Sequence, residues 1–189
     1  MIRIGILGDI GSGKSYVAKK FGYPVFNADK EVSLLYKKDR NIFNKLKKTI
    51  PKHIHKFPID KNEISQAIFA NKLNLKKIIK IVHLEIRKKM NTFLRKNKNK
   101  KIIILDIPLL LENKINKKKD ILVFVESKKL EILKRLKKRE NFNPKLLKKF
   151  KNIQLSLKYK KKKSKFIIIN DFSNRSVKIS IKKIIKKVS

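Results

Sequence analysis

The chain has few or none of several residue types, and each shortage excludes something. It contains no cysteine, which excludes disulfide bonds and thiolate metal sites. It also lacks any run of about 18 uncharged apolar residues, so no membrane-spanning helix is expected. Strand-like residues begin at Ile2, which does not match the layout of a signal peptide. Together these features predict a cytoplasmic protein with no membrane partner.

Acidic residues are scarce, with 14 Asp and Glu against 53 Lys and Arg and a formal net charge of +39. Such an excess can indicate nucleic-acid binding, because basic side chains displace counterions from phosphates. Here the basic residues are spread along the chain, only seven are arginine, and aromatic residues do not alternate with a basic stripe. Abundant lysine, isoleucine and asparagine are what A+T-rich codons produce. We therefore expect attraction of small anions but no specific nucleic-acid partner.

Glycine is also rare, and all five glycines fall within Gly5–Gly22. Three of them punctuate the segment Gly8–Ser15, GDIGSGKS, which matches the Walker A pattern between an apolar run and a helix-compatible stretch. In that context the loop N–H groups can cradle phosphates, Lys14 can reach the β- and γ-phosphates, and the Ser15 hydroxyl can bind Mg²⁺. A tight turn alone does not explain a lysine and a serine at these offsets. The motif therefore predicts phosphate binding.

Five short apolar runs predict the strands of a sheet. Several are continuously apolar, as strands covered on both faces are. The runs are Ile2–Leu7, Tyr23–Phe26, Ile102–Ile107, Ile121–Val125 and Phe166–Ile169. Helical patterns lie between them at Lys14–Phe21, Asp29–Lys38, Lys61–Phe69, Leu75–Arg95, Lys128–Glu140 and Pro144–Lys160. Alternation of strands and helices favours an α/β fold with a parallel sheet in a single domain, residues 1–189.

The gap between the second and third predicted strands, residues 30–101, is too long for one crossover. Its pattern is mostly helical, so we expect an inserted helical region there, which is a natural place for an acceptor pocket. Asn143-Pro144 reads as a cap and a first-turn proline that start a helix running through Gln154. The lysines Lys160–Lys163 are interpreted as a solvated helix end. Beyond Ile181 one apolar helix face is expected to pack on the sheet.

Two aspartates are candidates for the chemistry. Asp29 follows the second predicted strand, and the carboxyl ends of parallel strands line the ligand crevice of an open α/β sheet. Its carboxylate could accept the proton of an attacking hydroxyl, although a helix N-cap explains its position equally well. Asp106 closes the third strand, where a Walker B carboxylate would hold Mg²⁺. A charged residue there can also be simply a strand end.

Other polar residues leave both readings open. His83 lies in an apolar stretch, where a histidine is more often a core residue than a ligand. Arg135 and Arg139 are one turn apart on a predicted helix, so both could face one phosphate or both could be solvated. Glu112 follows a turn and could either support the site or be solvated. The histidines form no cluster that would predict zinc.

Together these motifs resemble the dephospho-CoA kinase family along nearly the full length of the chain. The combination of Asn27-Ala28-Asp29 with Asp106–Glu112, DIPLLLE, is more specific than the Walker A motif alone. The other matching residues are Gly8–Ser15, Ile59-Asp60-Lys61, Ala67–Asn71, His83, Arg135, Arg139, Gln154 and Ile168-Ile169-Asn170.

The resemblance implies transfer of the ATP γ-phosphoryl group to the 3′-hydroxyl of dephospho-CoA, the final step of coenzyme A biosynthesis. It implies a three-layer P-loop kinase fold, with a parallel five-stranded sheet flanked by helices, a helical acceptor region at about 30–100 and a lid at about 135–160. Asp29 and Lys14 would be catalytic, and Ser15 and Asp106 would hold Mg²⁺. Residues expected to bind ATP are Gly8, Gly11, Ser12, Gly13, Lys14, Ser15, Tyr16, Arg139 and Asn170. Those expected to bind the acceptor are Asp29, His83, Pro108, Leu109 and Leu110.

The chain departs from the family pattern at several positions, including Asn27 where the family has an aspartate. Asp9 replaces a usual glycine and places a negative charge in the phosphate loop. Leu84 replaces a proline, Lys61 replaces an arginine, and Phe150 stands where an arginine is often found, flanked by lysines. A lysine makes a point contact rather than a bidentate clamp.

Two other interpretations remain open from sequence. The first is a small-molecule or nucleotide kinase of the same fold with a different acceptor. The second is a basic P-loop protein that binds nucleic acid. The oligomeric state is not indicated by the sequence.

Overall fold

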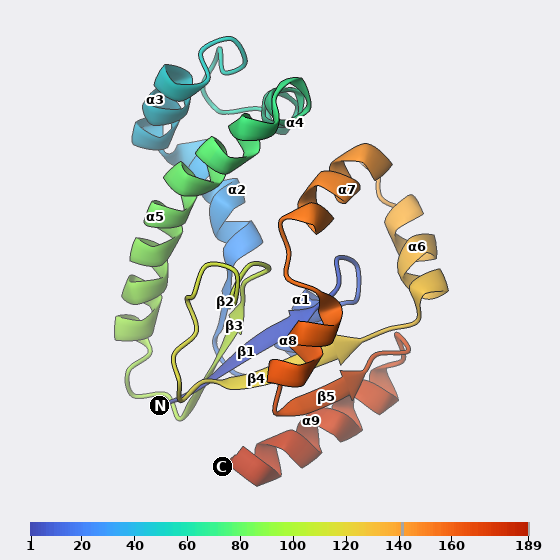
Figure 1. The fold of residues 1–189 in the computed structure, drawn as a ribbon. Coiled ribbons are helices and arrows are strands. Elements are labelled where there is room, and N and C mark those ends of the chain that lie inside the picture. Colours follow the sequence, from blue (N-terminus) through green and yellow to red (C-terminus); the bar gives the residue numbers. More distant parts are fainter. Residues whose placement is uncertain (141, 189) are drawn as a thin grey trace. The chain divides into compact units, whose positions relative to one another are not determined.

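The computed structural model describes residues 1–140 and 142–188, and in these residues the strands form one five-stranded parallel sheet (Figure 1). The strands are β1 (Ile2–Gly8), β2 (Val25–Asn27), β3 (Ile102–Asp106), β4 (Ile121–Glu126) and β5 (Phe166–Ile169). Their order across the sheet is β2-β3-β1-β4-β5, and every neighbouring pair is parallel. The predicted α/β class and all five predicted strands are confirmed, with end points that differ by a few residues.

The register aligns the carboxyl ends of the strands. Asn27, the last residue of β2, is paired with Asp106, the last residue of β3. Gly8, the last residue of β1, is paired with Val125 near the end of β4. Because the strands are parallel, the residues that follow them emerge at one edge of the sheet, where α/β proteins bind ligands.

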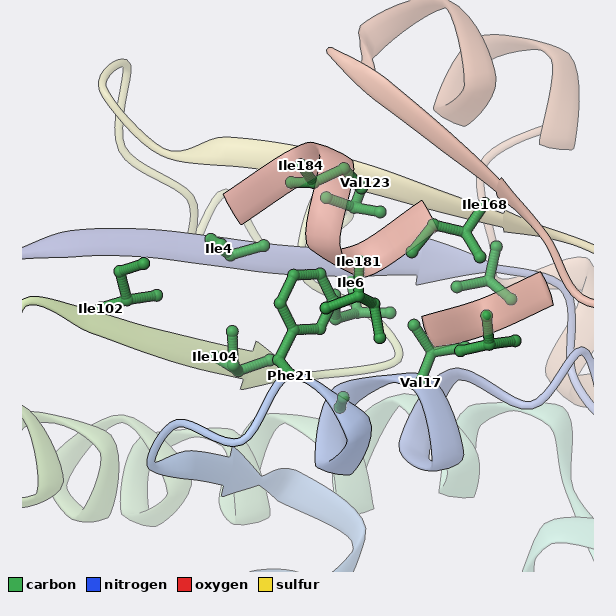
Figure 2. Packing of buried hydrophobic residues seen from close by; sticks show 13 residues of the cluster. Ile4, Ile6, Val17, Phe21, Ile102, Ile104, Val123, Ile168, Ile181 and Ile184 are labelled. Carbon is green, nitrogen blue, oxygen red and sulfur yellow. The ribbon is translucent and has the colours of Figure 1, made fainter. Parts of the chain in front are cut away.

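One face of the sheet is covered by α1 (Lys14–Lys20) and α9 (Asn174–Val188). Ile4 and Ile6 of β1 are fully buried in this layer, since alternate strand residues point to the same face (Figure 2). Val17 of α1 and Ile181 of α9 pack into the same cluster. The C-terminal apolar face therefore packs on the sheet, as its spacing predicts.

The other face of the sheet carries α8 (Leu157–Lys163) and the turn that follows β3 (Figure 1). A Cβ on Gly5 would lie 2.5 Å from Leu110 Cδ2 and 3.0 Å from Leu122 Cδ2. Only glycine therefore lets Leu110 approach β1 this closely. Leu110 is fully buried as a result.

The helix predicted over Pro144–Lys160 is wrong as a single helix, because it is broken into α7 (Pro144–Asn152) and α8. The Asn143 cap is confirmed, since its side chain accepts a hydrogen bond from Leu146 N at 3.1 Å. Ser156 caps α8 by accepting from Tyr159 N at 3.2 Å. A second capping side chain inside the predicted helix explains the break, because it satisfies the N–H groups of a new first turn.

The chain divides into two compact units, described here one at a time. The first contains the sheet and comprises Met1–Asn27 with the residues from Asn97 onward. The second is Ala28–Lys96 and is helical, as predicted for the insertion. Its helices are α2 (Ala28–Lys38), α3 (Arg40–Thr49), α4 (Lys61–Ala70) and α5 (Lys72–Lys96).

The second unit is built around α5. Its buried apolar residues recur every three or four positions, so they share one helix face: Leu75, Ile78, Val82, Ile86 and Met90. The helices α2, α3 and α4 each pack against α5. Tyr36 at the end of α2 is buried, and this burial raises its pKa to about 12. None of the described helices combines the length and apolar character needed to cross a bilayer.

Candidate nucleotide and acceptor site

The loop between β1 and α1 has the backbone geometry that a phosphate cradle needs. Gly11 and Gly13 have φ of +88° and +87°, in the left-handed region that favours glycine. Ser12 N donates to Asp9 O at 3.2 Å, which curls the loop. Gly13 is the N-cap residue of α1 and has no side chain that could accept hydrogen bonds from the amide groups of the first turn. A phosphate can therefore accept hydrogen bonds from them.

The Lys14 ammonium lies over this loop. Its Nζ donates to Asp9 O at 2.7 Å and to Gly8 O at 3.3 Å. These are carbonyl groups of the loop itself, so the positive charge is held at the loop. An anion bound in the loop would meet this charge without a large movement of the lysine.

The loop is braced by residues that follow β4 and β5. Asn170 is buried, and its Nδ2 donates to Ser12 O at 2.8 Å. Ser127 Oγ donates to the same carbonyl at 3.0 Å. A Cβ on Gly13 would clash with Asn170 Nδ2. The structure thus brings Asn170 to the predicted ATP loop, while Ser127 was not anticipated from sequence.

Ser15, Asn27 and Asp106 form a polar cluster at the ends of their strands and loop. Asn27 Nδ2 donates to Asp106 Oδ2 at 2.5 Å and to Ser15 Oγ at 3.5 Å. Asp106 is 3% exposed and Ser15 is exposed. The structure therefore joins the two predicted metal ligands through Asn27, a residue that sequence analysis matched to the family but did not assign to the site.

The remaining residues near the loop are placed as follows. Tyr16 donates its hydroxyl to Asn174 Oδ1 at 3.0 Å and so packs toward α9. The Arg135 guanidinium stacks over the Phe172 ring, 4.3 Å from its centroid. Arg139 is exposed and lies beyond α6 (Lys129–Lys137). The prediction that Arg135 and Arg139 share one helix is therefore wrong, because the helix ends before Arg139.

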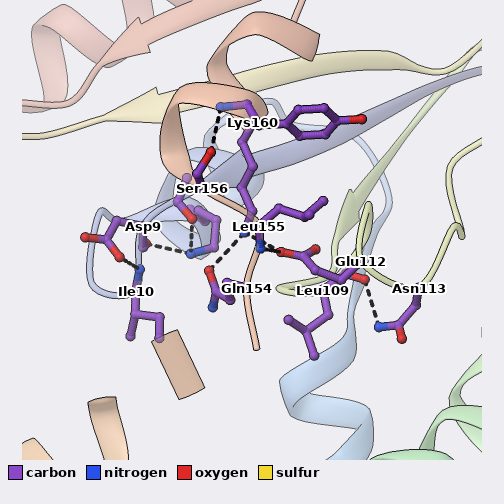
Figure 3. A network of polar contacts seen from close by, with 12 residues as sticks. Asp9, Ile10, Leu109, Glu112, Asn113, Gln154, Leu155, Ser156 and Lys160 are labelled. Carbon is purple, nitrogen blue, oxygen red and sulfur yellow. Dashed lines mark hydrogen bonds and ion pairs between the residues drawn. The ribbon is translucent and has the colours of Figure 1, made fainter. Parts of the chain in front are cut away.

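The turn after β3 is tied to the chain that follows α7 through a buried ion pair (Figure 3). Lys160 is 1% exposed, and its Nζ is 2.8 Å from Glu112 Oε1. Lys160 Nζ also donates to Gln154 Oε1 at 2.9 Å, and Leu155 N donates to Glu112 Oε1 at 2.9 Å. Glu112 is thus not solvated, and it joins the turn after β3 to α8 and to the segment between α7 and α8.

The acceptor candidates belong to different parts of the chain. Pro108 and Leu109 are half-buried in the turn after β3, and Leu110 beside them is buried in the first unit. His83 is half-buried on α5 of the second unit. Asp29 is exposed in the first turn of α2, two residues after Asn27. Their roles toward an acceptor stay predictions.

Comparison with known proteins agrees with this geometry. The family model for dephospho-CoA kinase matches residues 2–176. A dephospho-CoA kinase from Wolbachia pipientis wMel is 34% identical over 191 residues, covering 98% of this chain and 97% of the relative. The chain belongs to the dephospho-CoA kinase family. The resemblance drawn from the motifs is therefore confirmed.

Solved structures show the same fold. The crystal structure of TT1252 from Thermus thermophilus aligns with a TM-score of 0.80 at 25% identity, covering 100% of this chain and 98% of that one. Dephospho-CoA kinase from Campylobacter jejuni aligns with a TM-score of 0.63 at 24% identity, covering 99% and 97%. The P-loop kinase fold is confirmed. The family match shows that the chain is an ATP-dependent kinase of coenzyme A biosynthesis.

One further prediction from the sequence, on the lysine run before β5, is wrong in part. The run Lys160–Lys163 was interpreted as a solvated helix end, which holds for the exposed Lys161, Lys162 and Lys163. It is wrong for Lys160, which is buried against Glu112. Nothing in a run of four lysines distinguishes the first, because its burial depends on a carboxylate 48 positions earlier in the chain.

Proposed function

We propose that this chain transfers the γ-phosphoryl group of ATP to the 3′-hydroxyl of dephospho-CoA. The observation that carries the proposal is the Lys14 ammonium, held over a glycine-rich loop beside the Ser15–Asn27–Asp106 cluster. This arrangement suits a transition state in which charge spreads over the γ-phosphoryl oxygens, since catalysis there is mainly positioning and charge stabilisation.

The phosphate loop would bind the triphosphate. Amide groups of Gly11–Ser15 would donate to the β-phosphate, and Lys14 would turn from the loop carbonyls to the β- and γ-oxygens. Two facts support this role: Gly11 and Gly13 have left-handed backbone conformations, and the lysine already contacts a carbonyl of the loop. Tyr16, Arg139 and Asn170 complete the proposed ATP-binding set.

Ser15 and Asp106 would hold Mg²⁺, with Asn27 setting their separation. Hydroxyl and carboxylate oxygens are hard ligands, and Mg²⁺ on nucleotides keeps few protein ligands because phosphates and water fill the rest of its shell. The described residues contain no group of three or more His, Cys, Asp or Glu that could hold a metal, so two protein ligands with phosphates fit this chain better than a closed protein site. When bound, the ion would neutralise charge on the phosphates.

Asp29 would receive the proton of the 3′-hydroxyl. Asp29 is two residues from Asn27, so their Cα atoms are at most about 7 Å apart, and Asn27 contacts Ser15 Oγ. An exposed carboxylate two residues from Asn27 can accept a hydrogen bond from an incoming alcohol. His83 and Pro108–Leu110 would border the acceptor, and the lid at about 135–160 would exclude water that competes as acceptor.

Replacement of Asp29 by Asn tests this role. The amide cannot take the proton, so kcat should fall by about 10² to 10⁴-fold, while the ATP dissociation constant stays within about threefold. Glu31→Gln removes a carboxylate from the same first turn of α2 and should leave kcat nearly unchanged. Near-normal turnover in Asp29→Asn would leave Asp29 as a residue of the helix start only.

An acceptor screen tests the substrate. ADP release would be coupled to a colour change with dephospho-CoA, adenosine, nucleoside monophosphates and shikimate in parallel. We expect turnover with dephospho-CoA at a kcat/KM at least about 100-fold above the others, because each missing contact costs roughly a factor of ten. Indifference to dephospho-CoA would reject the proposal in favour of another small-molecule kinase.

A further inference from the structure

The side chain of Asp9, the acidic residue of the phosphate loop, has two partners. Its Oδ1 accepts a hydrogen bond from Ile10 N at 2.7 Å, which folds the carboxylate back on the loop (Figure 3). Its Oδ2 is 3.5 Å from Nζ of Lys151, in the last turn of α7. The Asp9 side chain is only 15% exposed. A negative charge is thus held at the loop and faced by a lysine from the predicted lid.

This carboxylate lies beside the place where the loop binds phosphate. The Asp9 carbonyl is the acceptor for Lys14 Nζ, so the same residue carries both the docking group of the catalytic lysine and an added negative charge. Unneutralised, the carboxylate would repel a triphosphate in the loop. Lys151 is a cation placed to offset this charge, because its Nζ lies 3.5 Å from Asp9 Oδ2.

We propose that Asp9 and Lys151 act as a matched pair that couples ATP binding to the position of α7. Lys151 is a positioning residue: it neutralises the Asp9 carboxylate, which allows the triphosphate to bind, and the same contact holds α7 against the phosphate loop. Asp9 is therefore the residue that the lid contacts at the loop. The repulsion between its carboxylate and a bound triphosphate is offset only when α7 is in place. The proposal rests on ATP binding by the loop and not on the identity of the acceptor.

The pair is suited to reversible docking rather than to folding. Lys151 is 45% exposed, so water can solvate its ammonium when α7 moves away. Exposed ion pairs contribute little to stability, and their strength falls as salt screens the charges. The contact can therefore form and break with each nucleotide cycle.

A double-mutant cycle on ATP affinity tests the coupling, with titration calorimetry as the readout on the full chain. Lys151→Ala should weaken ATP binding about tenfold, because the negative charge of Asp9 beside the phosphates has then lost this ion-pair partner. Asp9→Asn keeps the acceptor for Ile10 N and removes the charge, so alone it should change affinity by less than about threefold. In the double variant Asp9→Asn/Lys151→Ala, affinity should return to within about threefold of the wild type.

Two further measurements separate this role from a structural one. The effect of Lys151→Ala should shrink as ionic strength rises, and it should appear in the KM for ATP rather than in the KM for dephospho-CoA. Lys148→Ala removes an exposed lysine from the same helix and should change ATP affinity by less than about twofold.

The proposal would be overturned if Lys151→Ala lowered ATP affinity equally in the wild type and in the Asp9→Asn variant. It would also be overturned if Lys151→Ala left ATP affinity unchanged. These binding measurements need no acceptor. If ATP binds and the cycle shows coupling while dephospho-CoA is not phosphorylated, the acceptor assignment fails and the coupling stands.

Discussion

The phosphate loop and the segment that returns from α7 are held by different means. The loop is shaped by its own backbone, with left-handed glycines and a carbonyl braced by Asn170 and Ser127. The return segment, residues Gln154–Lys160, is held by one buried side-chain charge pair to Glu112. A second substitution elsewhere cannot restore a backbone conformation that only glycine adopts easily. A buried ion pair, in contrast, can be exchanged for a neutral pair of side chains that fills the same space. The two regions should therefore respond differently to paired substitutions.

The largest expected effect is on the buried ion pair between Lys160 and Glu112. Lys160→Met keeps the length of the side chain and leaves Glu112 with a buried charge and no ion partner. The free energy of unfolding should fall by about 3–5 kcal/mol. Urea unfolding measures it, with Lys162→Met as the matched control, because Lys162 is exposed on the same helix. Equal losses in the two variants would contradict the buried ion pair.

The second prediction restores what the first removes. In Glu112→Gln/Lys160→Met the buried charge is absent, and the new amide oxygen still accepts from Leu155 N. We expect recovery of at least about 2 kcal/mol of the stability lost by Lys160→Met, since removing both charges of a buried pair is far less costly than removing one. Urea unfolding of the double variant is the measurement. A double variant no more stable than Lys160→Met would show that the return segment does not depend on charge.

The third prediction concerns the loop, where no such recovery is expected. Gly13→Ala combines a residue at φ +87° with a clash on Asn170 Nδ2. ATP affinity should fall about tenfold, equal to about 1.4 kcal/mol, and Asn170→Ala in the same chain should not restore it, because the backbone strain remains. Gly22→Ala is the control, since Gly22 also has positive φ but nothing within 4 Å of its Cβ position. Unchanged ATP affinity in Gly13→Ala would refute the cradle.

The smallest effect is expected for the partly exposed ion pair between the phosphate loop and α7. Lys151→Ala should change the free energy of unfolding by less than about 1 kcal/mol, because the pair with Asp9 is partly solvated. The same urea experiment that detects Lys160→Met measures it. A loss comparable to that of Lys160→Met would mean that Lys151 is part of the folded framework rather than a reversible contact.

Sequence reasoning was strongest where local pattern and geometry coincide. The Walker A spacing predicted the loop, and the five apolar runs predicted the strands. It was weakest where a side chain's neighbour lies far along the chain. In the sequence Lys160 looks like one of four solvated lysines. Asn27 looks only like a match to the family motif, and its contact with Asp106 follows from the strand register. The helix break at Ser156 had a local signal, a capping serine, that the pattern of lysines obscured.

By itself the sequence determined the parallel α/β class, the phosphate loop and the family, because glycine spacing, strand hydrophobicity and motif order are local properties of the chain. Only the tertiary structure decided which of many similar lysines are buried or paired, and that Asn27 joins Ser15 to Asp106. The physical reason is that burial and pairing depend on which distant segments the sheet register brings together, and a chain of 53 lysines and arginines offers many equivalent candidates for each contact.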